Sequence, residues 1–436
     1  MQPGGLTALS VGQQKVGQTV TFNVPPGTGA ISIISQGLDT SAITVSGATQ
    51  PPDTITFGGT VLPNTVVPTI LKDPTGRVVY DDDPPQALPT DPSGLDAFYG
   101  GSSPWTGMMT VPNATPLLAH TALQGGLVPG QWQFTVNDYA LECTHPQHTS
   151  DCGATGSTTS AYDVEVVLKP GVAPATGTID VAFYVVSGTA ASLIANPNFI
   201  RVTQRLAQLY AQAGLCIATI QVYDLPSWAQ TRFGGLINAS DDTPCGELSQ
   251  LFTLSAPGNQ INFFLVNGFT DKSGGSLNVI GIDGTIPGPS SYGGTINSGA
   301  AVSAADLNAT GNCGSTFSPA ACGPDLVAYT ASHEGGHFLG LYHPTERTGD
   351  AFDPLSDTKK CPCISCAQPN SARNNCASVN PLVQPTLMSN SFCVSASTAP
   401  ECGGGTNLMF WLVGPESTGT LTPQQGQVMR ANPVVR

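Results

Sequence analysis

One run of eleven residues constrains this chain more than any other. From His333 to His343 it has the pattern H-E-x-x-H-x-x-G-x-x-H. Positions i and i+4 of a helix share a face, so His333 and His337 can present two imidazoles to one metal ion. Gly340 can adopt a positive φ and end the helix, which would return His343 as a third ligand. Three neutral nitrogens with one open position indicate a catalytic zinc, because structural zinc sites usually have four protein ligands.

Glu334 directly follows the first histidine of this run. From there its carboxylate can reach a water molecule on the metal without binding the metal itself. Three of the six histidines in the chain lie in the run. The alternative is a helix with a solvated polar face and no metal, since short motifs also occur by chance. We therefore predict Zn²⁺ held by His333, His337 and His343, with Glu334 as the general base.

The same eleven residues resemble the zinc motif of the metzincin metallopeptidases. The stretch after them, with Gly349-Asp350, Asp357-Thr358 and Cys361, is similar to the pappalysin branch of that clan. The resemblance covers roughly the second half of the chain and is strongest around the motif. It implies a secreted zinc endopeptidase that hydrolyses peptide bonds in a protein or peptide substrate.

The resemblance also implies a methionine turn beneath the zinc, for which the chain offers Met409 and Met388. We prefer Met409, because a helix expected over 421–430 follows it, as a final helix follows the turn in that family. Plain core packing is the alternative for either methionine. Trp411 stands where some members of the family have a tyrosine, and its side chain has no hydroxyl group.

The composition of the 436 residues limits which structures and binding partners are compatible with this chain. Charged residues make up only 10%, whereas Gly (50) and Pro (37) are plentiful, which favours short strands and long loops. The net charge of −15 argues against a nucleic-acid partner, because phosphate binding needs clustered Lys and Arg. No apolar run is long enough for a transmembrane helix. The oligomeric state stays open.

Twelve cysteines predict disulfide bonds and an oxidising compartment. They form the local groups Cys143/Cys152, Cys216/Cys245 and Cys313/Cys322, followed by Cys361, Cys363, Cys366, Cys376, Cys393 and Cys402. The alternative is a second metal site at Cys361, Cys363 and Cys366, although their spacing is not that of a usual zinc knuckle. We expect a secreted or cell-surface protein whose signal peptide or anchor is absent from this sequence.

The first part of the chain, residues 1–172, is predicted to be an all-β sandwich. Expected strands, separated by Gly and Pro breaks, lie at 20–24, 31–34, 69–72, 131–136 and 162–168. Whether this is an accessory domain or a pro-domain stays open. The acidic run 81–83 is either a structural Ca²⁺ loop or a solvated turn, the interpretation we favour. His145 and His148 are interpreted as surface residues.

Residues 173–436 are predicted to form the catalytic domain. A strand at 179–186, an amphipathic helix at 198–213 and strands at 217–223 and 261–266 indicate parallel neighbours in a mixed sheet. This order resembles the upper subdomain of a metzincin, an α+β fold in which the zinc helix packs beneath the sheet and a loop-rich subdomain follows. The zinc helix is expected to begin near Pro324. The edge strand that binds substrate in that family is expected within 293–304, with an ordinary surface loop as the alternative.

Two other functions remain compatible with the residues. The first is an adhesin or binding protein in which the β-domain acts and the metallopeptidase fold is inactive. The second is a latent zymogen, in which a thiolate of Cys143 or Cys152 blocks the zinc. A disulfide between those two cysteines would exclude that block.

Overall fold

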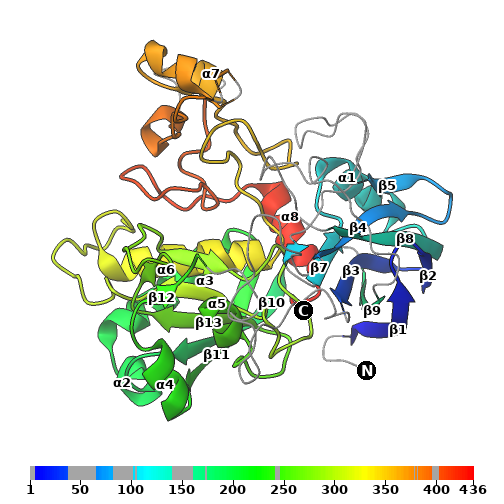
Figure 1. Ribbon diagram of the computed structural model, residues 1–436, viewed down its shortest axis with the longest axis horizontal. Coiled ribbons are helices and arrows are strands. Elements are labelled where there is room, and N and C mark those ends of the chain that lie inside the picture. Colours follow the sequence, from blue (N-terminus) through cyan, green and yellow to red (C-terminus); the bar gives the residue numbers. More distant parts are fainter. Residues whose placement is uncertain are drawn as a thin grey trace.

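The computed structural model describes residues 5–37, 65–81, 102–103, 106–139, 161–171, 174–240, 246–377, 379–380, 382–394 and 402–436. The chain has three parts in space (Figure 1). Antiparallel strands from the first 170 residues form one part, and a mixed sheet with helices forms the second. The third is a disulfide-rich segment, residues 361–402, which projects from the other two around α7 (Cys363–Cys366). The predictions for the acidic run 81–83, for His145 and His148 and for the pair Cys143/Cys152 concern residues outside the described part, and the side chain of Asp81 also lies outside it.

The first part consists of two antiparallel sheets. One has the strand order β1 (Thr7–Lys15), β9 (Ala161–Pro170), β3 (Thr28–Gly37), β7 (Thr106–Val111) and β6 (Ser102–Ser103). The other has the order β2 (Thr19–Val24), β8 (Gly130–Tyr139), β4 (Thr65–Lys72) and β5 (Val78–Asp81). Alternate residues of β2 are buried, as expected of a strand with one face toward a core. Both sheets contribute to a single hydrophobic cluster, which includes Ile33, Val166, Trp132 and Phe134.

The second part contains a five-stranded mixed sheet. Its order is β11 (Leu215–Asp224), β10 (Gly177–Val185), β13 (Ile261–Val266), β16 (Ala300–Ser303) and β15 (Gly281–Asp283). The first four strands run parallel to their neighbours, and β15 is antiparallel to β16. The predicted strand at 261–266 coincides with β13. The parallel pair β10 and β11 agrees with the strand–helix–strand order in the sequence.

Helices cover both faces of this sheet. On one face, α3 (Pro197–Ala211) buries Phe199, Val202 and Leu206 against a core that also contains residues of α6 (Gly323–Phe338). On the other, α4 (Ser227–Phe233) and α5 (Glu247–Phe252) pack over residues such as Tyr184 of β10. The short elements here are α2 (Ala190–Ile194), β12 (Ile237–Asn238) and β14 (Phe269–Thr270). The sheet therefore holds α6, which carries the first two histidines of the motif, on a rigid base.

The prediction of the edge strand was wrong. Within 293–304 the structure has β16, which is hydrogen-bonded on both sides, to β13 and to β15. The two edges of the sheet are β11 and β15, and the edge next to β16 is β15. Its sequence, Gly-Ile-Asp, has no apolar alternation, so only pairing with the buried strand β16 makes it a strand.

Helix α8 (Pro423–Ala431) connects the parts of the molecule. A capping box of Thr422 and Gln425 starts this helix, close to the range predicted at 421–430. In Figure 1, α8 lies between the N-terminal sheets and the mixed sheet. Near its start it contacts α1 (Thr115–Gln124), where Thr115 donates a hydrogen bond to the side chain of Gln424 at 2.5 Å.

Disulfide bonds shape the third part. The bonds there join Cys361 to Cys393, Cys363 to Cys376 and Cys366 to Cys402, while Cys313 is bonded to Cys322 just before α6. Because every cysteine of the proposed second metal site is in a disulfide, that alternative is wrong. Cys216 is an unpaired, exposed thiol, and its expected partner Cys245 is not among the described residues.

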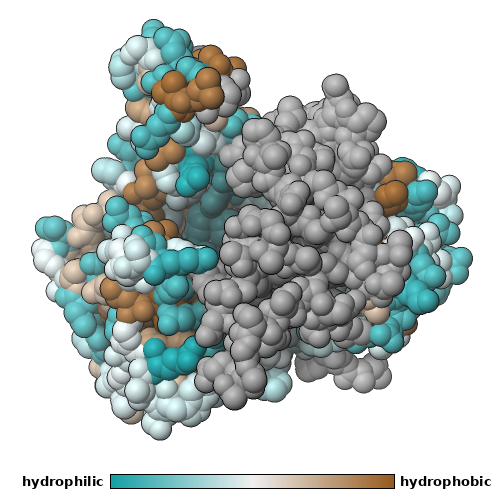
Figure 2. Space-filling view, in the orientation of Figure 1, coloured by the Kyte–Doolittle hydropathy of each residue, from teal (hydrophilic) through white to brown (hydrophobic). Residues whose placement is uncertain are grey.

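The disulfide-rich segment contains α7 and two 3-10 turns, η3 (Asn370–Asn375) and η4 (Asn390–Cys393). Apolar side chains gather on its surface (Figure 2). They are Ile364, Val379, Leu382, Val383 and Leu387. The buried cluster of this segment consists mainly of its six bonded cysteines, so disulfides rather than a large apolar core hold it together. Across the described ranges, each helix is too short or too polar to span a bilayer.

Candidate metal centre

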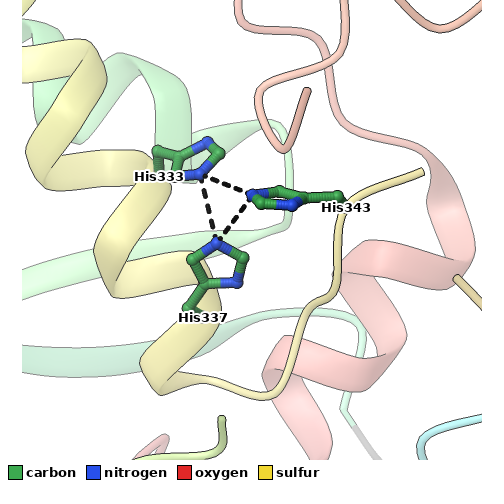
Figure 3. A group of neighbouring side chains, drawn as sticks. All are labelled: His333, His337 and His343. Atoms are coloured by element: carbon green, nitrogen blue, oxygen red, sulfur yellow. Dashed lines mark hydrogen bonds between the residues drawn. The ribbon is translucent and has the colours of Figure 1, made fainter. Parts of the chain in front are cut away.

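Three histidines meet at the end of α6. His333 and His337 lie one turn apart on this helix, and His343 follows in the chain segment after it (Figure 3). The Nε2 atoms of His333 and His337 are 3.1 Å apart. Nε2 of His343 is 3.2 Å from that of His337 and 3.3 Å from that of His333. The three predicted ligands therefore form one compact group that could hold a metal ion.

The return of His343 depends on a sharp helix end. Helix α6 ends at Phe338, and Gly340 has φ of 100°, a conformation that residues with a side chain rarely adopt. The backbone N–H of Gly340 donates to the carbonyl of His337, and that of Leu341 donates to the carbonyl of Gly336. This pattern satisfies carbonyls that would otherwise lack partners at the helix end.

The other ring nitrogen of each histidine has an oxygen partner. Nδ1 of His333 is 2.7 Å from the Leu408 carbonyl, and Nδ1 of His337 is 2.7 Å from the Leu341 carbonyl. Nδ1 of His343 lies 3.0 and 3.1 Å from the two carboxylate oxygens of Glu346. Carbonyl and carboxylate oxygens only accept hydrogen bonds, so the proton of each neutral ring is on Nδ1.

This tautomer leaves three bare Nε2 lone pairs directed at one another. Lone pairs cannot bond among themselves, so their convergence suits a cation held between them. Nitrogens bound to one tetrahedral ion at about 2.0–2.1 Å would lie about 3.3 Å apart, close to the observed 3.1–3.3 Å. The residues present therefore fit a metal ion with three histidine ligands.

Electrostatics favour the neutral rings that a metal needs. Burial lowers the pKa of His333 to about 3, and the nearby His343 contributes to that shift. Burial lowers the pKa of His337 well below its usual value, and the nearby His333 and His343 lower it further. Both rings are therefore deprotonated at neutral pH and ready to bind a metal.

Glu334 lies against the edge strand of the mixed sheet. Its side chain is buried, and the backbone N–H of Asp283 in β15 donates to its carboxylate. Burial raises the pKa of Glu334 to about 8, and this hydrogen bond offsets a smaller part of the shift. A Cβ at Gly281 in β15 would lie only 2.3 Å from Oε1 of Glu334, so this position has room only for glycine.

The two adjacent glycines of the motif have separate packing roles. A Cβ at Gly335 would lie 2.0 Å from the hydroxyl of Tyr210 on α3. A Cβ at Gly336 would lie 2.5 Å from Sδ of Met409. Each glycine costs about 1 kcal/mol of helix propensity relative to Ala, and the close packing on both sides explains why they are there.

Met409 belongs to a turn directly beneath the motif helix. The preceding residue, Leu408, supplies the carbonyl that accepts from His333, and Tyr329 of α6 donates to the carbonyl of Asn407 at 3.1 Å. Met388, the rival methionine, lies instead in the buried cluster of the disulfide-rich segment. The indole N–H of Trp411 donates to the carbonyl of Met388 at 2.9 Å, which binds this side chain to the same segment.

Asp357, one of the residues that resemble the pappalysin branch, has a structural contact. Its carboxylate accepts hydrogen bonds from the Thr422 hydroxyl and from the backbone N–H of Gln424, both at 2.8 Å. An acidic group at this place stabilises the first turn of α8, where backbone N–H groups lack helical partners.

Sequence reasoning missed Glu346 and the contribution of β15. The spacing of Glu346, three residues after His343, is a signal that could have identified it, because metal-bound histidines commonly donate to a carboxylate. Asp283 and Gly281 had no such signal, since only the pairing of β15 with β16 brings them to Glu334.

Comparisons with known proteins add little to this geometry. No family model matches the chain, and no curated protein matches it. Among solved structures, it is similar to one described as the crystal structure of metalloproteinase-II from Bacteroides fragilis, with 13% identity and a TM-score of 0.23. The match covers 48% of this chain and 58% of that chain, less than two thirds of its length. A likeness this low carries no argument about fold or activity.

Proposed function

We propose that the protein is a zinc-dependent endopeptidase. The observation that supports it most directly is the convergence of three bare histidine nitrogens beside the buried carboxylate of Glu334. His333, His337 and His343 would hold Zn²⁺, which when bound lowers the pKa of a water ligand to about 7 and polarises a carbonyl.

Glu334 moves the proton in this proposal. Its carboxylate accepts a proton from the attacking water and donates it to the leaving amine of the cleaved peptide bond. The hydrogen bond from Asp283 and the close contact at Gly281 hold the carboxylate in one position.

A protein or peptide substrate is proposed from the position of β15. This strand is the antiparallel edge of the sheet and contacts Glu334, so an extended peptide that pairs with it would pass close to the general base. The resemblance of the motif supports a metzincin, and the stretch at 349–361 supports its pappalysin branch. In the same proposal, the two N-terminal sheets form a β-sandwich accessory domain over 1–172, followed by the catalytic domain at 173–436.

The disulfides support a secreted or cell-surface location, because such bonds persist in oxidising compartments. The structure gives the other functions less support. A binding protein with an inactive fold has no use for a buried general base beside three converging histidines. The thiolate block of a zymogen involves Cys143 or Cys152, which lie outside the described residues.

Glu334→Gln tests the assignment. We expect the variant to bind one zinc ion, as the parent does, but to lose cleavage of a protein substrate by at least a hundredfold, because general-base catalysis contributes about 10²–10⁴-fold. Glu416→Gln, the same change at an exposed site, is the control and should cleave normally. Parent protein that binds zinc but shows no chelator-sensitive proteolysis would favour the binding-protein alternative.

A further inference from the structure

One of the three histidines has a different kind of partner. The Nδ1 atoms of His333 and His337 face backbone carbonyls, which are neutral and belong to the buried core. That of His343 faces the carboxylate of Glu346, at 3.0 and 3.1 Å from its two oxygens. His343 is also the ligand that does not lie on α6, so the helix backbone does not fix its ring.

Backbone hydrogen bonds hold Glu346 at this place. Its N–H donates to the carbonyl of Ala351 at 2.9 Å, and its carbonyl accepts from the N–H of Gly349 at 2.8 Å. The side chain of Glu346 is 42% exposed, so packing holds it only in part and its orientation depends on this turn. The turn over 346–351 therefore decides whether the carboxylate faces His343.

Hydrogen bonds from the disulfide-rich segment hold the turn over 346–351 in place. The N–H of Cys363 donates to the carbonyl of Gly349 at 3.0 Å, and the N–H of Met388 donates to that of Arg347 at 2.8 Å. Just before the turn, the hydroxyl of Thr345 accepts from the N–H of Cys361 at 2.9 Å. Cys361 and Cys363 are both in disulfides, so cross-linked backbone supports the loop that carries Glu346.

We propose that Glu346 is a positioning residue for the third metal ligand, and that the disulfide-rich segment acts on the metal centre by holding Glu346 against His343. The carboxylate keeps the proton on Nδ1, orients the ring and makes Nε2 a stronger ligand, as carboxylate partners of metal-bound histidines do. The proposal rests on the proposed metal function.

Zinc affinity tests it without relying on activity. The affinity of the parent, Glu346→Gln and Glu346→Ala is measured by competition with a chromogenic chelator. Loss of such a partner costs about 10–100-fold in metal affinity, so we expect a loss in that range for Glu346→Ala. Glu346→Gln keeps an acceptor oxygen and should lose less. Glu416→Ala and Glu416→Gln are the matched controls and should bind as the parent does. Equal affinity of Glu346→Ala and parent, within twofold, would overturn the proposal.

Gly349→Ala tests the role of the segment. Gly349 has φ of 68°, and an added Cβ would lie 2.7 Å from the backbone nitrogen of Cys363, so the turn must shift. We expect weaker zinc binding from this variant. Combined with Glu346→Ala it should cause little further loss, because both changes act through one contact. Fully additive losses would show that the segment does not act through Glu346.

The same measurements separate the two proposals. Parent protein that binds no zinc contradicts the proposed function. If the parent and the Glu346 variants bind zinc equally tightly, the proposed metal centre stands but the positioning role of Glu346 is contradicted.

Discussion

At the scale of single residues, Gly281 decides where Glu334 can lie. A Cβ at this position would come within 2.3 Å of Oε1 of Glu334 and 2.6 Å of Cγ2 of Thr330. Real Cβ contacts are not this short, so the carboxylate or the strand has to move. Glycine in β15 therefore permits close approach of the proposed general base to the edge strand.

We expect Gly281→Ala to lower kcat/KM for peptide cleavage by about tenfold to a hundredfold, because small misplacements of catalytic groups are costly. Zinc affinity should stay within twofold, since no histidine moves. Gly311→Ala is the control, because an added Cβ there meets no atom within 4 Å. Unchanged kcat/KM in a correctly folded Gly281→Ala protein would argue against Glu334 as the base.

At the scale of elements, a buried ion pair joins α3 to the first turn of α6. Arg201 binds the fully buried carboxylate of Asp325 through two hydrogen bonds of 2.7 and 2.8 Å. Burial alone would raise the pKa of Asp325, but the contacts with Arg201 and the N–H of Ser318 outweigh it and lower the pKa. The pair thus fixes the start of the helix that carries His333 and His337.

Replacing Arg201 by Met should lower the free energy of unfolding by about 3 kcal/mol, because the buried carboxylate keeps only the longer contact with Arg205 and the N–H of Ser318. Urea denaturation measures this loss. Arg205→Met is the comparison, since Arg205 is 3.4 Å from the same carboxylate and makes a weaker contact. The interpretation fails if both variants lose the same stability.

At the scale of the whole molecule, the N-terminal part binds both ends of α8. Thr115 contacts Gln424 at its start, and the buried Nζ of Lys169 donates to the carbonyls of Arg430 and Asn432 at its end. Helix α8 also supports the metal centre, because the side chains of Gln425 and Asn407 exchange two hydrogen bonds, of 2.9 and 3.1 Å. The first 170 residues are therefore coupled to the turn that contains Met409.

Lys169 should make stability depend on pH. Burial, and then the charge of Arg430, lower the pKa of Lys169 to about 7, from a usual value of 10.5. Between pH 7 and about 10, the unfolded chain binds a proton that the folded protein lacks, so this site makes stability rise with pH across that window.

Between pH 7 and 9, the gain in unfolding free energy should be about 2 kcal/mol larger in the parent than in Lys169→Met. Denaturation at both pH values measures the difference. Lys15→Met, a change at an exposed lysine, should show the same gain in unfolding free energy between pH 7 and 9 as the parent. A gain that is the same in parent and Lys169→Met would show that Lys169 does not titrate in this range.

Much of the molecule could be predicted from the sequence where the physics is local. The spacing of His333, His337 and His343 suffices to bring them together, because helix geometry places i and i+4 on one face and Gly340 supplies the turn. The periodicity of 198–213 predicted α3 for the same reason. The even number of cysteines predicted disulfides, as the structure shows for four pairs.

Only the tertiary structure decided which distant segments meet. The edge strand beside Glu334 is β15 rather than a strand within 293–304, because β16 pairs on both sides and β15 on one side only. Pairing with β16, and not a local pattern, makes β15 a strand. The partners of the C-terminal cysteines and the approach of Gly281 to Glu334 follow from contacts between residues far apart in the chain. Glu346 is predictable only in part. Its spacing from His343 is a local signal, but the disulfide-rich segment sets its orientation. Local periodicity thus determined which three histidines meet in the candidate metal centre, and long-range packing determined what holds them.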